Sequence, residues 1–154
     1  MNATAKVTEA QAARQAWLGL LARAELTELE GFWSTIEPKP LFKELRAPEI
    51  GLVMARGRMG GDGQPFNFGE VTVTRCSVQL DNGALGHGYT MGRDRAKARF
   101  IALLDGMLQD QARAPSIHEG LLQPLEARLA QERNASAEKA AATKVDFFTM
   151  ARER

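Results

Sequence analysis

The segment CSVQLDNGALGHGYTMG, residues 76–92, determines how the remaining strands and helices can be arranged. Asn82-Gly83 sits between two runs with strand-like composition, and this dipeptide is the strongest short signal for a β-hairpin, because a type I′ turn needs positive φ at both central residues. A two-residue turn there pairs Asp81 with Ala84. That pairing predicts the register along both strands, and the register decides which side chains share a face.

One face of the predicted hairpin is rich in side chains. In this register Val78 lies opposite His87 and Cys76 lies opposite Tyr89, and we expect this face to pack against the helices. His87 and His118 are far apart in the sequence, and neither has a metal-ligand spacing. We therefore interpret both histidines and the single cysteine as satisfied core groups, and we predict no metal site.

The other face of the predicted hairpin is bare. It pairs Gln79 with Gly86 and Ser77 with Gly88, beside Arg75. Glycines inside a strand mark places where another group approaches the backbone closely. The flat strip therefore admits three occupants, which the sequence leaves open: a ligand, the backbone of a partner or a closely packed helix.

Hydrophobic periodicity predicts helices before and after a sheet. Apolar residues at helical spacing follow Thr8, a helix-capping residue, and follow Asp94 as well. The predicted elements are, in order, helices at 8–24 and 26–36, strands at 41–46, 52–58, 70–80 and 84–92, a helix at 94–111, a short helix capped by Ser116 and Glu119, and a last helix from Leu125 to Thr143. We expect an α+β fold with an antiparallel sheet of about four strands and an extended C-terminal helix. Residues 1–115 form the predicted core domain, and residues 116–154 form a C-terminal helical extension and docking tail.

The composition is that of an ordinary globular protein. The chain has 154 residues, of which 44% are hydrophobic and 25% charged, and its net charge is +1. This charge gives no global field that would attract nucleic acid or an anionic membrane. One cysteine excludes a disulfide framework, and the N-terminal segment lacks the apolar stretch of a signal peptide. With no apolar run near 18 residues, we expect a cytoplasmic protein that binds neither membrane nor nucleic acid.

The glycine-rich segment RMGGDGQPFNFGE, residues 58–70, does not match a known phosphate loop. A P-loop needs GxxxxGK[ST], and GGDGQP offers neither the lysine nor the hydroxyl. The glycines of GHGYTMG fall inside a strand, not at the strand-to-helix turn that a dinucleotide fingerprint requires. Neither a serine elbow nor a combination of cysteine, histidine and acid is legible in the sequence. The chain alone therefore does not look like a catalyst.

Arginines on and beside the predicted sheet are the candidate anion-binding groups. Their planar guanidinium forks suit bidentate binding of phosphate or carboxylate. The candidates for anion binding or partner contact are Arg56, Arg58, Gly60, Gly61, Arg75, Arg93 and Asp94. The alternative interpretation is that two or three of these arginines are solvated or pair with Glu70, Asp62 and Asp94.

Two adjacent phenylalanines near the C-terminus have no obvious cover. Val145, Phe147, Phe148 and Met150 follow a predicted helix that has lost its apolar stripe. These side chains either tuck back onto this domain or dock into another subunit. We favour docking, because interfaces between permanently associated subunits are built from such apolar anchors.

The chain resembles the PhnG family, the G subunit of the bacterial carbon-phosphorus lyase system for phosphonate use. The resemblance is carried by GLVMARGRMGGDGQPFNFGEVTVTRCSVQL, DNGALGHGYTMGRD and VDFFTM, which with the helices around them cover nearly the whole chain. The residues that match the family motifs are Arg58, Gly60, Gly61, Arg75, Gly92, Arg93 and Asp94. No catalytic residue is carried over with them, and a phosphate-facing or interface role for them is our hypothesis.

The resemblance implies a part in forming α-D-ribose 1-phosphonate 5-triphosphate, a step in which a phosphonate displaces adenine from the ribose of MgATP. It implies that the G subunit acts in this step with the H, I and L subunits, and that the I subunit carries the central chemistry. It also implies a core of G, H, I and J subunits with two copies of each, in which this chain lies closest to I. MgATP is then a substrate of the complex, and this chain binds no cofactor.

Two functions from different classes follow. The first is a structural subunit that helps to complete the active site of the carbon-phosphorus lyase complex. The second is a stand-alone module that binds an anion or a nucleotide on its arginine and glycine surface. A stand-alone module should be a monomer that takes up ATP by itself, whereas an assembly subunit should dimerise or aggregate alone and bind ATP weakly.

Overall fold

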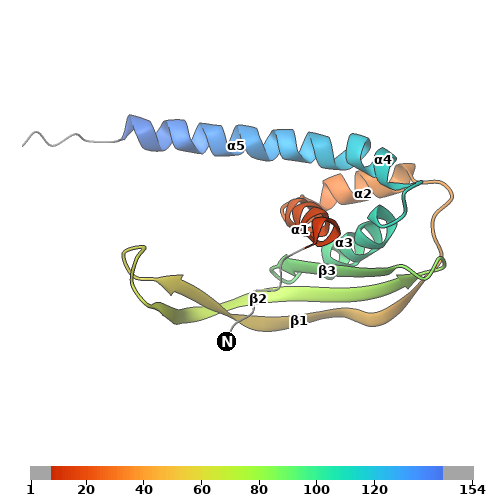
Figure 1. Ribbon diagram of the computed structural model, residues 1–154, viewed down its shortest axis with the longest axis horizontal. Helices are drawn as coiled ribbons and strands as arrows, with labels where there is room; N and C mark the ends of the chain where they lie inside the picture. The colour runs from red at the N-terminus through yellow and green to blue at the C-terminus, as the bar shows by residue number, and fades with distance from the viewer. Residues whose placement is uncertain (1–7, 144–154) are drawn as a thin grey trace, which may run out of the picture.

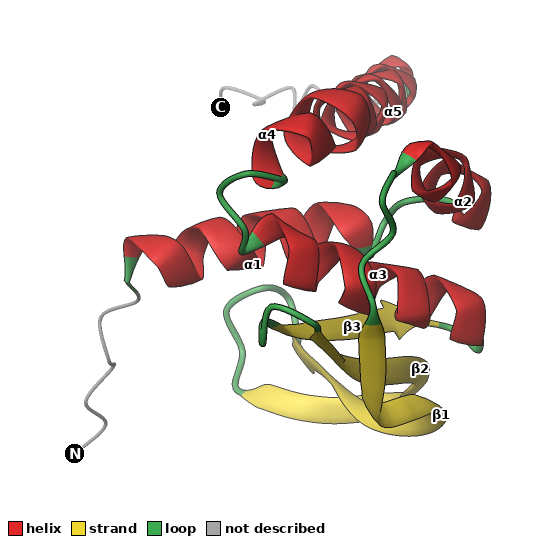
Figure 2. Cartoon of the chain, turned by 90° about the vertical axis from the view of Figure 1, so that its right-hand side faces the viewer, coloured by secondary structure: helices red, strands yellow, loops and turns green. Residues whose placement is uncertain are grey.

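The protein is an α+β structure in which all helices lie on one face of an antiparallel sheet (Figures 1 and 2). The computed structural model describes residues 8–143. The elements are, in chain order, α1 Glu9–Leu21, α2 Leu26–Thr35, β1 Phe42–Arg58, β2 Pro65–Leu80, β3 Leu85–Met91, α3 Arg95–Leu108, α4 Ala114–Ile117, the π-helix η1 His118–Leu122 and α5 Gln123–Ala142. The strand order β1-β2-β3 makes β2 the central strand and leaves β1 and β3 as edges. The predicted fold class is confirmed.

The sheet has three strands in the described residues, where the sequence predicted about four. The two predicted strands at 41–46 and 52–58 are one strand, β1, which is 17 residues long. It passes through Pro48 with a shift of register between Arg46 and Glu49. A proline is tolerated at such an irregularity on an edge strand, because the missing N–H faces away from the ladder. The proline therefore bends a single strand and does not divide it.

The hairpin between β2 and β3 forms, but its predicted register is wrong by one residue. Leu80 donates its N–H to the Ala84 carbonyl at 2.9 Å, so the turn holds three residues. Of these only Gly83 has positive φ, at 84°, which is the geometry of a three-residue hairpin loop. Gln79 therefore pairs with Leu85. This slip moves the side chains of β3 to the face opposite the predicted one.

The bare glycine strip lies under α3. A Cβ on Gly86 would lie 1.9 Å from the Ala102 carbonyl oxygen, and a Cβ on Gly88 would lie 1.9 Å from that of Ala98. Ala98 and Ala102 are four residues apart and therefore occupy the same face of the helix. Of the three occupants that the sequence left open, the closely packed helix is the one in the structure.

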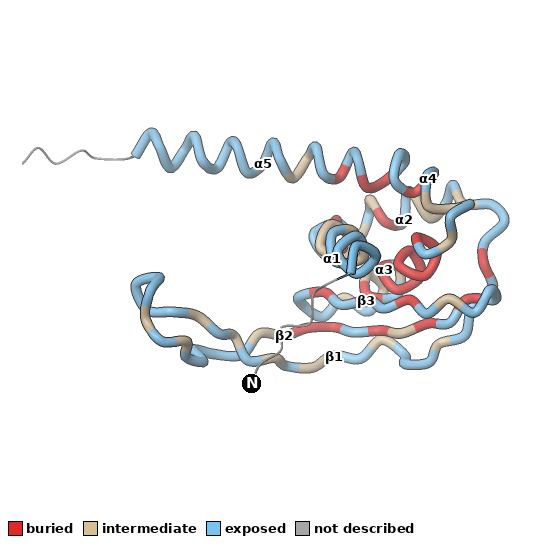
Figure 3. Tube along the Cα trace, in the orientation of Figure 1, coloured by how far each residue is buried: buried red, intermediate tan, exposed pale blue. Residues whose placement is uncertain are grey.

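Helix α3 lies on the sheet beside α1, with α2 and the C-terminal helices packed over it (Figure 3). Its second half, residues 101–108, is buried on all sides, whereas in residues 95–100 only Ala98 is buried. The buried core combines residues of α3 with residues of the sheet and of the other helices. Its members are Leu21, Ala24, Leu29, Cys76, Val78, Leu80, Ala98, Ile101, Ala102, Leu103, Leu104, Met107, Leu108, Ile117, Leu121, Leu122 and Leu125.

A buried carboxylate ties α1, α3 and β3 together. Asp105 has no exposed surface. Its Oδ1 accepts hydrogen bonds from Trp17 Nε1 at 2.8 Å and Arg14 Nε at 3.1 Å, and its Oδ2 accepts from Arg14 Nη2 at 2.6 Å and the His87 amide at 2.8 Å. A buried charge is tolerated when it is paired and hydrogen-bonded in this way. Asp105 therefore holds the first helix and the edge strand in one arrangement.

The C-terminal helices pack on the core for their first turns only. Ser116 lies inside α4 and donates from Oγ to the Arg113 carbonyl at 2.8 Å, so the predicted capping box with Glu119 is wrong. Ile117 and Leu125 both belong to the core, so packing is continuous across residue 115, and the predicted domain division stays a prediction. Beyond the half-buried Leu129 the rest of α5 is exposed (Figure 3).

We predict that Gly88→Ala destabilises the protein strongly. The added methyl group has no space between β3 and α3, and overpacking of this kind costs about 1–3 kcal/mol or more. Gly51→Ala is the matched control, because a Cβ there meets nothing within 4 Å, so it should change stability by less than about 0.5 kcal/mol. Urea unfolding of the two variants measures both effects, and equal stabilities would contradict the close packing.

Candidate functional site

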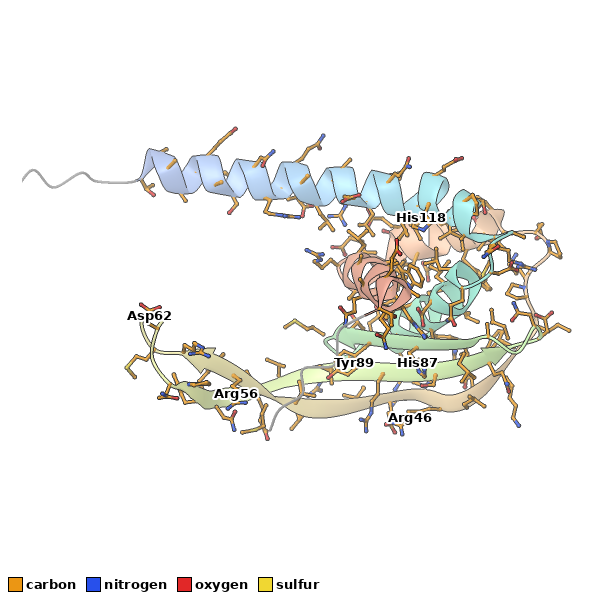
Figure 4. All side chains as sticks on the ribbon, viewed as in Figure 1. Arg46, Arg56, Asp62, His87, Tyr89 and His118 are labelled. Atoms are coloured by element: carbon orange, nitrogen blue, oxygen red, sulfur yellow. The ribbon has the colours of Figure 1, made fainter. Side chains whose placement is uncertain are left out.

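The face of the sheet turned away from the helices carries a polar cluster, which we call the uncovered face. Two neighbouring cross-strand rows supply it, and both follow from the observed register. The first row is Arg46, Ser77 and His87, and the second is Glu49, Arg75 and Tyr89. Figure 4 shows Arg46 on the side of β1 that points away from the helices. The one-residue slip therefore brings His87 and Tyr89 to the same face as Arg75.

Two guanidinium groups share one carboxylate in this cluster. Glu49 Oε1 accepts from Arg75 Nε at 2.6 Å and from Arg46 Nη1 at 3.1 Å. About half of each of these side chains is exposed. Next to them Ser77 Oγ and His87 Nδ1 are 3.0 Å apart. A guanidinium has five N–H donors, so both arginines keep donors that could bind an oxyanion.

Both histidines are exposed, which corrects the prediction that they are core groups. His87 stands on the uncovered face, and His118 lies in η1 among the helices of the other side. Cys76 is buried as predicted, and burial, together with the nearby Glu44 carboxylate, raises the pKa of its thiol. Within residues 8–143, no group of three or more histidine, cysteine or acidic side chains is placed to hold a metal ion.

The β1–β2 hairpin extends well past β3 as a two-stranded arm of residues 52–72, which we call the ribbon (Figure 1). Arg56 and Arg58 lie near its end, and a pocket of about 330 Å³ opens between them, lined also by Gly57 and Pro65. The loop at the tip, where Figure 4 labels Asp62, turns at two further predicted site residues. These are Gly60, with φ of 63°, and Gly61, with φ of 87°. Such values favour glycine, so the loop shape accounts for both.

Gly92 and the predicted site residues Arg93 and Asp94 lie where β3 passes into α3. Asp94 is the N-cap of α3, and its Oδ1 accepts from the Lys97 amide at 2.8 Å. Gly92 has φ of 89°, and its carbonyl accepts from Thr74 Oγ1 at 2.8 Å. Arg93 between them is exposed. Asp94 and Gly92 therefore have structural roles that do not need a ligand.

The predicted arginines do not meet in one site. Arg75 pairs with Glu49, and Arg56 lies seven residues farther along β1, which corresponds to about 23 Å at 3.3 Å per residue. Arg75 pairs with none of the acids suggested as its alternatives; its partner is Glu49, which it shares with Arg46, and no local pattern in the sequence indicates this pair. One ligand cannot reach both groups of arginines, which leaves the uncovered face and the tip of the ribbon as separate surfaces.

The chain matches a family model described as phosphonate metabolism protein PhnG over residues 12–153. The chain belongs to the PhnG family. A relative in Rhizobium meliloti (strain 1021), alpha-D-ribose 1-methylphosphonate 5-triphosphate synthase subunit PhnG, is 48% identical over 141 residues, which are 92% of this chain and 90% of the relative.

Two of the three family-like segments lie within the described residues. The first two form the ribbon with its continuation into β2 and the hairpin with the start of α3, so the PhnG motifs outline the sheet. The third, VDFFTM, contains the predicted docking residues Val145, Phe147, Phe148 and Met150, and it lies outside the described residues. In the described part of this PhnG chain, no helix is both long and apolar enough to cross a membrane.

One ion pair fastens α5, the helix that leads to this tail, to α2. Arg128 Nε donates to Glu28 Oε1 at 2.8 Å, and Arg128 Nη2 donates to Glu28 Oε2 at 2.9 Å. Burial by itself would raise the pKa of Glu28, but the hydrogen bonds from Arg128 and from the Glu25 amide outweigh it, so the pKa falls below its ordinary 4.5. The pair therefore stabilises the docked helix whenever Glu28 is ionised.

We predict that this stabilisation disappears in acid. Because the folded-state pKa of Glu28 is lowered, the contribution is present above the unfolded value near 4.5 and is lost as the pH falls through the folded-state pKa. Thermal unfolding should show the native PhnG chain to be more stable than Glu28→Gln at neutral pH, with the gap closing below about pH 4. Glu30→Gln, at an exposed position of α2, is the control. A gap that stays constant with pH would contradict the assignment.

Proposed function

We propose that this chain is a subunit of an α-D-ribose 1-methylphosphonate 5-triphosphate synthase, which joins a phosphonate to the ribose of MgATP with release of adenine. The observation that carries the proposal is the 48% identity to a synthase subunit over 92% of the chain. Chains this similar over this length share a fold.

The proposed partners are the H, I and L subunits for the synthase step and the J subunit for the core assembly, with two copies of this chain and its closest contact to the I subunit. In this assembly MgATP is bound as substrate by the complex, and this chain contributes no cofactor. The proposal is supported by the part of α5 beyond Leu129, which is exposed along its whole described length. A helix that buries little of its own surface is suited to contact another chain.

Within this role, the uncovered face is proposed to meet a phosphate or carboxylate at a subunit interface. Arg75 and Arg46 both pair with Glu49, and about half of each of these three side chains is exposed. Bidentate guanidinium contacts of this kind position an oxyanion without a proton transfer. The cluster lies on one face of a sheet, so the opposite wall of such a site would come from a partner subunit.

Reconstitution of the subunits and measurement of adenine release tests both points. Without this chain no adenine should form, and adenine release in its absence would reject the proposed function. Arg75→Ala should lower release by about tenfold or more while the assembly persists, as expected for loss of a charged contact to a substrate. Arg99→Ala is the matched control, because Arg99 also binds a single glutamate, Glu44, at 2.6 Å. Undiminished release by Arg75→Ala in an intact assembly would reject the ligand role.

Deletion of residues 145–154 tests the proposed docking tail. The deletion should abolish co-purification with the I subunit, because it removes the two phenylalanines that would anchor the contact. Removal of residues 151–154 alone is the control, since it leaves the apolar anchors in place, and it should leave co-purification unchanged. Normal co-purification of the longer deletion would show that the tail does not dock.

A further inference from the structure

The exposed apolar side chains of this protein are concentrated on its strands. In the part of the chain that the structure describes, every exposed large hydrophobic residue falls between positions 41 and 91: Leu41, Phe42, Leu45, Ile50, Leu52, Met54, Met59, Phe66, Phe68, Leu85, Tyr89 and Met91. The helices contribute none of them. Monomeric proteins rarely expose so many neighbouring apolar side chains without a binding role.

The ribbon holds the densest part of this surface. Leu52 is 62% exposed and Met54 is 56% exposed, and Phe68 is 65% exposed although its ring lies over Gly57, at 3.1 Å from a Cβ built there. The rings of Phe66 and Phe68 meet edge to face with centroids 6.2 Å apart. A two-stranded hairpin with no third strand or helix against it is marginally stable in water. The ribbon therefore exposes apolar side chains on both of its faces, with Leu52 and Met54 on one and the two phenylalanines on the other.

The outer edge of β1 offers a regular backbone beside this surface. From Glu49 to Ala55 seven successive residues pair with β2 without a shift of register, and irregularities bound this stretch at both ends. Between these two residues the strand contains no proline and no lysine, the features that normally protect an edge from pairing. An extended segment can add to such an edge through backbone hydrogen bonds, with side-chain contacts supplying specificity.

The charges around this stretch favour a different chain over a second copy of the same one. A two-fold axis centred on Leu52 would set Pro48 of one copy opposite Arg56 of the other and bring Arg46 toward Arg58. Pro48 has no backbone N–H to donate to the other copy, and the approach of Arg46 to Arg58 brings two positive charges together. Arg56 and Arg58 form no ion pair within residues 8–143. An occupant with carboxylates at one end would supply partners for both.

We propose that residues 49–55 of β1 pair with an extended apolar segment of another subunit of the synthase, whose acidic end lies beside Arg56 and Arg58. This segment adds a fourth strand to the sheet and covers the apolar side chains of the ribbon. The inference rests on the proposed function, because that function supplies the partner chain. It assigns the ribbon a role distinct from those of the C-terminal tail and the uncovered face.

Leu52→Glu tests the contact. Leu52 is mostly exposed, so the free chain should keep its melting temperature, whereas a buried carboxylate in the assembled ribbon should reduce the co-purified partner subunits by about tenfold or more. Leu41→Glu is the matched control, since Leu41 is 77% exposed and lies before the other end of β1. The control should retain the partners within about twofold. Normal co-purification of Leu52→Glu would overturn the proposal.

Hydrogen exchange of the free chain and of the assembled complex tests the strand pairing itself. Those amides of residues 49–55 that point away from β2 should become protected in the complex and stay unprotected in the free chain at all concentrations. Protection that appears in the free chain as it dimerises would assign the edge to a second copy and overturn the proposal. If adenine release requires the chain but these amides stay unprotected in the complex, the inference fails and the proposed function stands. A chain dispensable for adenine release overturns both.

Discussion

The close approach of α3 to β3 is the contact on which the rest of the structure depends. Gly86 and Gly88 leave room for the helix backbone at Ala98 and Ala102, and no larger residue could occupy those two strand positions. The helix then lies deep enough for its remaining faces to form the core with α1, α2 and the first turns of α5. Asp105, on the same helix, completes the arrangement by binding the amide of β3 and the side chains of α1.

This arrangement places every helix on one side and leaves the opposite face of the sheet to solvent or to a partner. Because β3 is short and the glycines anchor only that strand, β1 and β2 continue beyond the helical layer as the ribbon. The molecule thus offers three distinct surfaces to its surroundings: a polar face with Arg46 and Arg75, an apolar ribbon, and a long exposed helix. A small domain with so much unburied strand surface fits a protein that acts inside an assembly.

Membership in the PhnG family and the geometry agree on the kind of protein this is. The related synthase subunit identifies the proposed reaction, and the described residues show side chains suited to binding anions and partners. The motif residues divide between two kinds of role. Gly60, Gly61, Gly92 and Asp94 shape turns and cap a helix, whereas Arg75 is held on the uncovered face by a glutamate.

The sequence by itself determined those features that depend on neighbouring residues: the Thr8 cap, the helix and strand types, the hairpin at Asn82-Gly83, the glycine-rich connection and the family. The local sequence signals did not fix the number of residues in the turn. One extra residue there exchanged the faces of β3, which buried the glycines and exposed His87. Only the tertiary structure decided that exchange, because the register is chosen by what packs against the strand. For the same reason the Arg14–Asp105 pair, which joins residues 91 positions apart, and the single strand through Pro48 were visible only in three dimensions.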